Sequence, residues 1–124
     1  MDILIHNSSP DPIYAQIENQ IKGLIMQDKL KEGDCLPSMR MLAKELRISL
    51  ITTKRAYEEL ERDGFICTVA GKGSFVASKN LEILKEEHLK ELEGLLSRAI
   101  SLSKTCGISQ AEVLEMLKLL YKGD

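Results

Sequence analysis

A chain of 124 residues with 44% hydrophobic side chains is long enough for one compact domain, or for a small domain with an appendage. Its 17 Lys and Arg against 19 Asp and Glu give a formal net charge of −2, so the chain is not basic overall. The basic residues are concentrated, because residues 36–75 carry seven Lys and Arg against five Asp and Glu. No run is long and apolar enough to predict a membrane-spanning helix.

The first predicted element is a helix that begins at Asp11 and Pro12, after an extended or loose lead-in over residues 1–9. Asp at the cap and Pro at the first helical position suit a helix start, because an N–H has no helical partner there. The helix is expected to end near Asp28, which tolerates a left-handed backbone, and to pack across the two helices that follow. Its apolar stripe is formed by Ile13, Ile17, Ile21, Leu24 and Ile25, with Tyr14 beside it.

Two short amphipathic helices are predicted between residues 36 and 64, with almost nothing between them. Ser38 and Ser49 are the expected N-caps, and Gly64 follows the end of the second helix. A helix, a short turn and a second helix form the geometry that lays one helix in the major groove of DNA. The inward positions are Met39, Leu42, Ala43 and Leu46 in the first helix, and Ala56, Tyr57 and Leu60 in the second.

After Gly64 the pattern changes from helical to alternating, which predicts a hairpin with its turn at residues 70–73 and its second strand at 74–76. A two-stranded hairpin does not hold itself together in water, so it is expected to pack on the three helices and complete a winged helix. Lys72 would lie at the tip of the wing. In the first strand, Phe65, Cys67 and Val69 are predicted to point one way, and Ile66 and Thr68 the other.

The last third of the chain predicts a long helix from residue 81 to about 104, a break at 105–107 and a final helix that opens with a capping box of Ser109 and Glu112. Two such helices do not bury both apolar faces alone, so the same pair from a second copy is expected to cover them in a two-fold homodimer. The predicted domains are a DNA-binding domain over residues 1–77 and a dimerisation domain over 78–124. The predicted dimerisation residues are Leu84, Leu92, Leu95, Leu96, Ala99, Val113, Leu117 and Leu120.

Four segments, in their order and spacing, resemble the GntR family of bacterial transcription regulators. The short two-helix tail after them resembles the YtrA branch of that family, which implies control of a neighbouring transporter operon. The segments are PIYAQIENQI (12–21), L-x-x-G-D-x-L-P-S-x-R-x-L-A (30–43), RAYEELERDGFI (55–66) and GKGSFV (71–76).

The side chains expected to contact DNA lie on the outer side of the helical pair and at the tip of the hairpin. The resemblance puts Arg40, Thr52 and Lys54 at positions where the family contacts DNA. Leu50 stands where the family usually has Arg, so we expect a half-site with altered base preference, in which Leu50 contacts a thymine methyl group. The full set is Ser38, Arg40, Lys44, Ser49, Leu50, Thr52, Thr53, Lys54, Arg55, Gly71, Lys72 and Gly73.

Other kinds of site are not indicated. Cys35, Cys67 and Cys106 are an odd number at wide spacing, which favours a reducing cytoplasm over a disulfide framework. No Cys or His spacing indicates a metal site, and Cys67 is interpreted as a buried structural thiol. No nucleotide-binding or hydrolase motif is present, so neither a cofactor nor enzyme activity is expected. The polar face of the tail mixes Glu with Lys, which favours a partner helix over a membrane surface.

These patterns predict a cytoplasmic homodimer that regulates transcription, as a repressor, by gripping an inverted-repeat DNA operator with two recognition helices and two wings. Two alternatives stay open. One is a winged helix that serves protein contacts, with the tail as a docking helix pair. The other is a small-molecule-responsive regulator whose effector site lies at the dimer interface, although the sequence names no effector. Salt separates DNA binding from protein contacts, because phosphate contacts weaken steeply as ionic strength rises.

Overall fold

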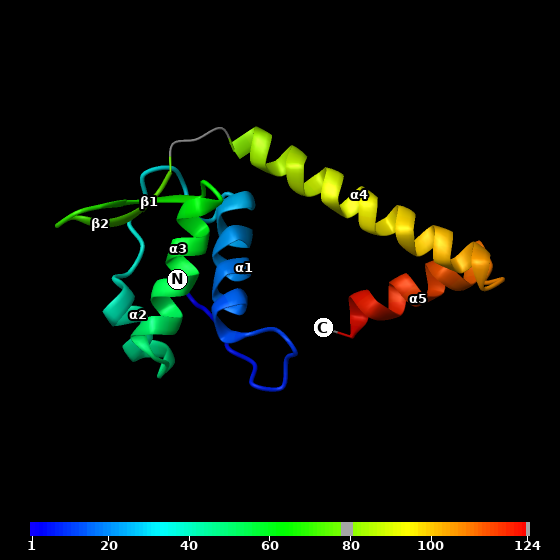
Figure 1. Ribbon diagram of the computed structural model, residues 1–124, viewed down its shortest axis with the longest axis horizontal. Helices are drawn as coiled ribbons and strands as arrows, with labels where there is room; N and C mark the ends of the chain where they lie inside the picture. The colour runs from blue at the N-terminus through cyan, green and yellow to red at the C-terminus, as the bar shows by residue number, and fades with distance from the viewer. Residues whose placement is uncertain (78–80, 124) are drawn as a thin grey trace. The chain divides into compact units, whose positions relative to one another are not determined.

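The computed structural model describes residues 1–77 and 81–123, and it confirms a mainly helical chain with a small antiparallel hairpin (Figure 1). The chain divides into two compact units, unit 1 over residues 1–81 and unit 2 from Glu82 onward. The predicted domain boundary after residue 77 borders residues 78–80, which lie outside the described residues. The elements are α1 (Ile13–Met26), α2 (Met39–Leu46), α3 (Leu50–Arg62), β1 (Ile66–Val69), β2 (Gly73–Val76), α4 (Leu81–Thr105) and α5 (Gln110–Lys122).

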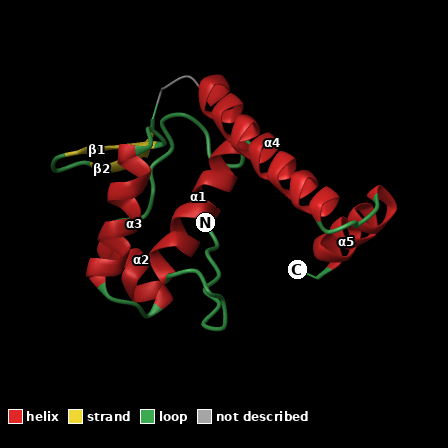
Figure 2. Cartoon of the chain, turned by 45° about the vertical axis from the view of Figure 1, so that its right-hand side comes forward, coloured by secondary structure: helices red, strands yellow, loops and turns green. Residues whose placement is uncertain are grey.

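Helix α3 is the centre of unit 1, because α1 and α2 both pack against it (Figure 2). The inward side chains of all three helices recur at helical spacing and include apolar positions that the sequence pattern predicts. The predicted three-helix core is therefore confirmed. Its buried residues are Ile17, Ile21 and Ile25 from α1, Leu42 and Ala43 from α2, and Thr53, Ala56, Tyr57 and Leu60 from α3.

The lead-in before α1 is extended and bound to that helix. The side-chain amide of Gln20 accepts from the Leu4 N–H at 2.9 Å and donates to the Leu4 carbonyl oxygen at 2.6 Å. Gln16 makes the same pair of hydrogen bonds with His6, at 2.8 and 3.1 Å. Ile3 is buried as well. Two glutamine amides therefore pair with the backbone as a neighbouring strand would, so the lead-in is not loose.

The predicted cap of α1 is wrong by one residue. Pro12, not Asp11, is the N-cap, and it makes no side-chain cap. The Pro12 carbonyl accepts the first helical hydrogen bonds, from Ala15 and Gln16 at 3.0 and 3.1 Å. The Asp11 carbonyl accepts from the Gln16 side chain at 3.0 Å, which ties the lead-in to α1 at this point too. At the other end Asp28 adopts a left-handed φ of 59°, as expected.

Lys22 joins α1 to the C-terminal end of α3. Its Nζ lies 2.8 Å from carboxylate oxygens of both Glu18 and Asp63, and 5.3 Å from the centre of the Phe65 ring. Partial burial disfavours the charged ammonium, but the hydrogen bonds to Asp63 and Glu18 outweigh this effect and raise the pKa of Lys22. The ammonium therefore stays charged at neutral pH and fixes where α1 meets α3.

The facing of β1 differs from the prediction. Ile66 pairs with Val76 and both are buried, whereas Cys67 and Val69 are exposed. The cause lies before the strand, where the chain turns Phe65 into the core so that Ile66 takes the first inward position of β1. The interpretation of Cys67 as a buried thiol is wrong for the same reason.

The segment before α2 covers the outer edge of β2. The Val76 N–H donates to the Asp34 carbonyl, and the Leu36 N–H donates to the Ser74 carbonyl, at 2.9 and 2.8 Å. The hairpin is therefore paired on both sides of β2 and is held against the helices.

Unit 2 exposes most of its apolar side chains. The predicted break and capping box are confirmed, since Gly107 has a φ of 72° and Ser109 and Glu112 cap each other reciprocally. Among the described residues of unit 2, Ser103 alone is buried. The two helices therefore leave apolar faces uncovered within a single chain. The exposed leucines include Leu92, Leu95, Leu96, Leu117 and Leu120.

The hydroxyl of Tyr57 provides a test of the packing in unit 1. The side chain is buried, and its hydroxyl donates to the carbonyl oxygen of Pro37 at 2.7 Å. Tyr57→Phe removes this hydrogen bond, so we expect it to lower the free energy of unfolding by about 1 kcal/mol. Urea unfolding of the two proteins at neutral pH, followed by circular dichroism, measures the difference.

The same phenol predicts a loss of stability at alkaline pH. Burial raises the pKa of Tyr57 above its ordinary value of about 10. The unfolded chain therefore releases this proton at a lower pH, so the contribution is complete below about pH 10 and is lost as the pH rises further. We expect wild-type stability to fall more steeply above about pH 10 than that of Tyr57→Phe. Parallel stability curves would contradict this prediction.

Candidate nucleic-acid interface

A serine closes the N-terminal end of both α2 and α3. Ser38 Oγ accepts from the Met41 N–H, and Ser49 Oγ accepts from the Thr52 N–H, each at 3.1 Å. Ser49 Oγ also lies 2.8 Å from the Thr52 hydroxyl oxygen. Both predicted caps are confirmed. The first turn of a capped helix retains a positive partial charge, so the start of α3 is a favourable place for a phosphate.

Arg47 begins the turn between α2 and α3 in a left-handed conformation, with a φ of 56°. The Ile48 N–H donates to the Ala43 carbonyl at 3.0 Å across this turn. A left-handed backbone costs a residue other than Gly about 1–2 kcal/mol. Arg47 is exposed, so its guanidinium lies free of the core near the start of α3. The predicted contact set lacks Arg47, although an Arg in so short a turn is a signal that could have found it.

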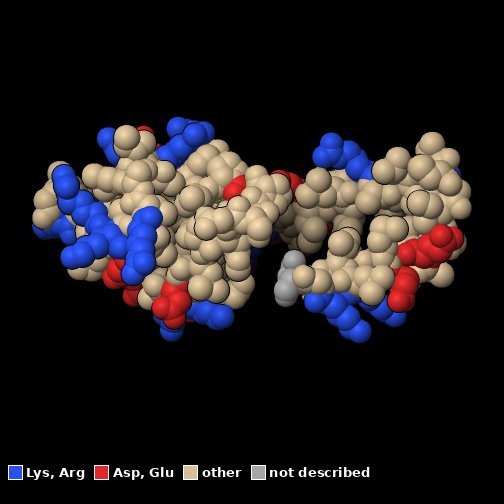
Figure 3. Space-filling view, turned by 90° about the horizontal axis from the view of Figure 1, so that it is seen from below, with Lys and Arg blue, Asp and Glu red and all other residues tan. Residues whose placement is uncertain are grey.

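Exposed cations surround the start of α3. Arg40 and Lys44 lie on α2, and Lys54 lies in the first half of α3. Lys and Arg side chains gather over this end of unit 1 in the view from below (Figure 3). The acidic residues of α3 lie in its second half and at its end, so the positive end of the helix dipole is also the cationic end. This arrangement suits a polyanion that meets α3 at its N-terminus.

Two predicted contact residues are held elsewhere. Thr53 is fully buried and its hydroxyl donates to the Ser49 carbonyl at 3.2 Å, so the prediction that it contacts DNA is wrong. The helical period puts residue 53 on the same face as Ala56, which packs into the core. Arg55 is exposed, but its guanidinium lies 3.8 Å from the centre of the Tyr14 ring on α1. This cation–π contact holds Arg55 toward α1.

The first turn of α3 presents apolar side chains beside the cations. Leu50 is 37% exposed and Ile51 is 80% exposed, whereas Thr52 is half-buried. Ile51 lies outside the predicted contact set. The helical period could have found it, because it lies two residues before the buried Thr53 and so falls far from the inward face.

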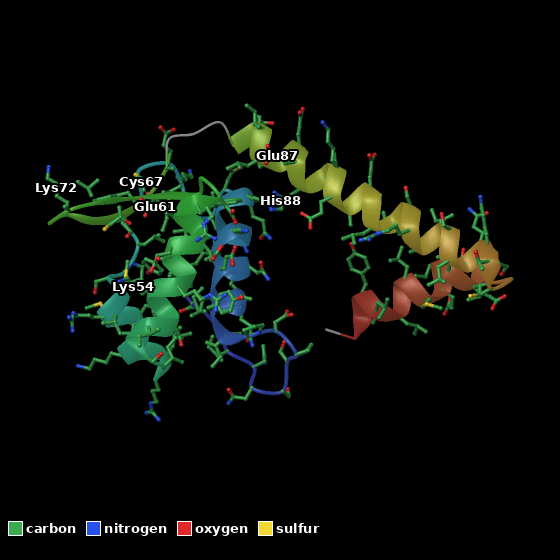
Figure 4. The ribbon with its side chains drawn as sticks, in the orientation of Figure 1. Lys54, Glu61, Cys67, Lys72, Glu87 and His88 are labelled. Carbon is green, nitrogen blue, oxygen red and sulfur yellow. The ribbon has the colours of Figure 1, made fainter. Side chains whose placement is uncertain are left out.

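The tip of the hairpin presents one more cation. The Lys72 N–H donates to the Val69 carbonyl at 2.9 Å and closes the turn. Gly71 and Gly73 adopt φ of 77° and 116°, which a side chain would strain. Lys72 is exposed and lies at the free end of the hairpin, while Lys54 projects from α3 (Figure 4). Both cations belong to unit 1, on two elements that α3 and its short connection to β1 hold together.

Other chemistry is not indicated in the part of the chain that the structure describes. Its residues contain no group of three or more His, Cys, Asp or Glu placed to hold a metal ion. Cys35, Cys67 and Cys106 are free and exposed. No described helix is long and apolar enough to cross a membrane. The chemistry that these residues do offer is attraction of an anion by exposed cations and a helix N-terminus.

Comparison with known proteins places this interface in a family. The model described as "Bacterial regulatory proteins, gntR family" matches residues 13–76, which is about half of the chain and runs from the start of α1 to the end of β2. Two relatives from Bacillus subtilis match nearly the whole chain. The uncharacterized HTH-type transcriptional regulator YhcF is 36% identical over 93% of this chain and 94% of its own length. The HTH-type transcriptional repressor YtrA is 34% identical, over 94% of this chain and 89% of its own length.

A solved structure with DNA covers the region of unit 1. The DNA-binding domain of AraR in complex with operator ORX1 has a TM-score of 0.55 and 28% sequence identity. The match covers 62% of this chain and 96% of that chain. That similarity, with the family match, extends the likeness from sequence to fold.

Arg47 allows a test of the left-handed turn. Arg47→Gly relieves the cost of a side chain in this conformation, so we expect the free energy of unfolding to rise by about 1 kcal/mol. Arg47→Ala is the matched control, because it removes the same guanidinium but keeps a Cβ. Urea unfolding of the three proteins measures both changes. A glycine variant no more stable than the alanine variant would show that the turn does not carry this cost.

Proposed function

The chain belongs to the gntR family of bacterial regulatory proteins, and from this we propose that it is a homodimeric repressor of an inverted-repeat operator. At the coarser level the family already fixes the function: the chain is a DNA-binding transcription regulator and not an enzyme. The observation that carries the proposal is the capped, cationic N-terminal end of α3. Resemblance to the YtrA branch extends the proposal to a neighbouring transporter operon and to a cytoplasmic location.

Phosphate and base contacts divide between different residues in this proposal. Arg40, Lys44 and Lys72 are exposed cations that neutralise phosphates and supply affinity. Thr52 and Lys54 face the groove from the first half of α3 and contribute base preference. Arg47 joins the phosphate contacts, because it is exposed and precedes α3 directly in the chain. Arg55 contributes by stacking on Tyr14, which fixes α3 against α1.

The cap serines contribute through the backbone rather than through base contacts. The hydroxyls of Ser38 and Ser49 are already engaged at the starts of α2 and α3. Their role is to begin each helix at a fixed residue, which leaves N–H groups of the first turn directed toward a phosphate. The glycines at 71 and 73 likewise let the hairpin turn so that its backbone approaches DNA closely.

Unit 2 is the proposed dimerisation segment. Its exposed leucines would become buried against the same residues of a second copy, and a two-fold axis would then present two copies of α3 to an inverted repeat. The printed name of YtrA describes a repressor of closely similar length, which supports repression as the direction of control here. The residues that carry this part are Leu84, Leu92, Leu95, Leu96, Ala99, Val113, Leu117 and Leu120.

Lys54→Ala tests the DNA interface. The operator is first recovered by selection from random duplex DNA, and affinity is then measured by fluorescence anisotropy over a range of salt concentrations. Loss of one phosphate or base contact should weaken binding by about 1–3 kcal/mol per half-site, and a lost phosphate contact should lower the salt slope by about 1. Arg62→Ala is the matched control, since Arg62 is an exposed cation at the opposite end of the same helix and pairs with Glu59.

We expect Arg62→Ala to bind DNA as the wild type does. Equal losses for the two variants would place the DNA elsewhere on unit 1. Failure of the selection to yield any motif, with protein contacts that are insensitive to salt, would instead favour a winged helix that serves protein contacts.

Leu117→Glu tests the dimer. A charge in a buried apolar interface is strongly unfavourable, so we expect light scattering to show a single chain where the wild type shows two. Binding to the full inverted repeat should weaken at least about tenfold, because two half-sites are no longer joined, while binding to an isolated half-site should persist. Lys118→Glu is the control, because it introduces the same side chain at an exposed polar position of α5. A dimer that survives Leu117→Glu would contradict the proposed interface.

A further inference from the structure

Ile51 is an apolar side chain at the start of α3 with no part in the core of unit 1. It is 80% exposed, and Leu50 beside it is 37% exposed. The core of α3 is filled by residues on its other face, among them the fully buried Ala56 and Leu60. An isoleucine exposed to this extent contributes little to folding, because it removes little apolar surface from water.

The position of Ile51 places it among the groups that would meet DNA. It follows Ser49, which caps α3, by two residues and precedes Lys54 by three. Residues three apart on a helix share a face, so Ile51 and Lys54 lie on the same outward side. The cationic end of α3 therefore contains an apolar side chain surrounded by groups that attract phosphate.

The major groove of DNA offers one apolar group to such a side chain. The edges of guanine, cytosine and adenine present hydrogen-bond donors and acceptors, whereas thymine adds a C5-methyl group. We propose that Ile51, with Leu50 beside it, contacts a thymine methyl group in each half-site, so that the operator requires thymine at a fixed position. This inference rests on the proposed DNA-binding function and assigns one base of its recognition sequence.

The contact would favour thymine by burying apolar surface and not by a hydrogen bond. Burial of one methyl or methylene group is favourable by about 0.8 kcal/mol, which corresponds to about fourfold in affinity. Ile51 has no polar side-chain atom, so it cannot read the donor and acceptor pattern of any base. Specificity at this position should therefore depend on the methyl group alone.

Replacement of thymine by deoxyuridine isolates that group, because it removes the methyl and leaves every hydrogen-bonding atom in place. Each thymine of the selected half-site is replaced in turn, and the affinity of the wild type and of Ile51→Ala is measured for every duplex. We expect at least one replacement to weaken wild-type binding about fourfold. Ile51→Ala should bind the thymine duplex more weakly and should show little further loss with deoxyuridine at that position.

Two further variants serve as controls. Lys54→Ala should weaken binding to the thymine and deoxyuridine duplexes by the same factor, because its loss is electrostatic. Ile51→Val keeps an apolar β-branched side chain and should retain most of the preference for the methyl group. Deoxyuridine placed outside the half-sites should change nothing.

Several results would overturn the inference. Wild-type binding that is indifferent to deoxyuridine throughout the half-site, or a penalty that persists in Ile51→Ala, would show that Ile51 does not contact a thymine methyl. A change of oligomeric state in Ile51→Ala, measured by light scattering, would show that Ile51 covers a protein surface instead. Failure of the proposed function is distinguishable, because the selection from random DNA would then yield no motif, and both proposals would fall.

Discussion

Burial of one face of α3 is the constraint on which unit 1 depends. Thr53, Ala56, Tyr57 and Leu60 leave water almost completely, because α1 and α2 pack on the same helix. A helix that is covered along one face has only its outer face and its ends left for function. At the N-terminal end that surface is cationic, and it carries Ile51 and Lys54 outward. Packing and recognition therefore divide a single helix between them, residue by residue.

Polar contacts fix the arrangement that apolar burial alone would leave free to slide. The hydroxyl of Tyr57 bonds the backbone just before α2, and Lys22 bridges α1 to the end of α3. Gln16 and Gln20 hold the lead-in against α1. Each such contact contributes about 1 kcal/mol or less to stability, but each requires a specific geometry. Their combined effect is to hold the recognition surface in a fixed position relative to the core.

Unit 2 obeys the same physics with a different outcome. Its helices expose leucines along their length, and no third element of the described chain covers them. The hydrophobic effect that stabilises unit 1 internally is therefore available in unit 2 for association. A regulator that reads an inverted repeat needs two copies of its recognition helix, so an uncovered apolar pair of helices complements a self-contained DNA-binding unit.

The sequence by itself determined the helices, the serine caps at residues 38 and 49, the hairpin and the family, because these follow from local periodicity, turn chemistry and motif spacing. It also indicated which third of the chain is basic. Tertiary structure decided the burial of Thr53, the stacking of Arg55 on Tyr14, the exposure of Cys67 and the left-handed backbone at Arg47. A one-residue change in facing reverses every position of a strand, and a contact between helices joins residues far apart in sequence. Neither depends on local pattern, because both are set by how α1 and the turn at Gly64 pack against α3.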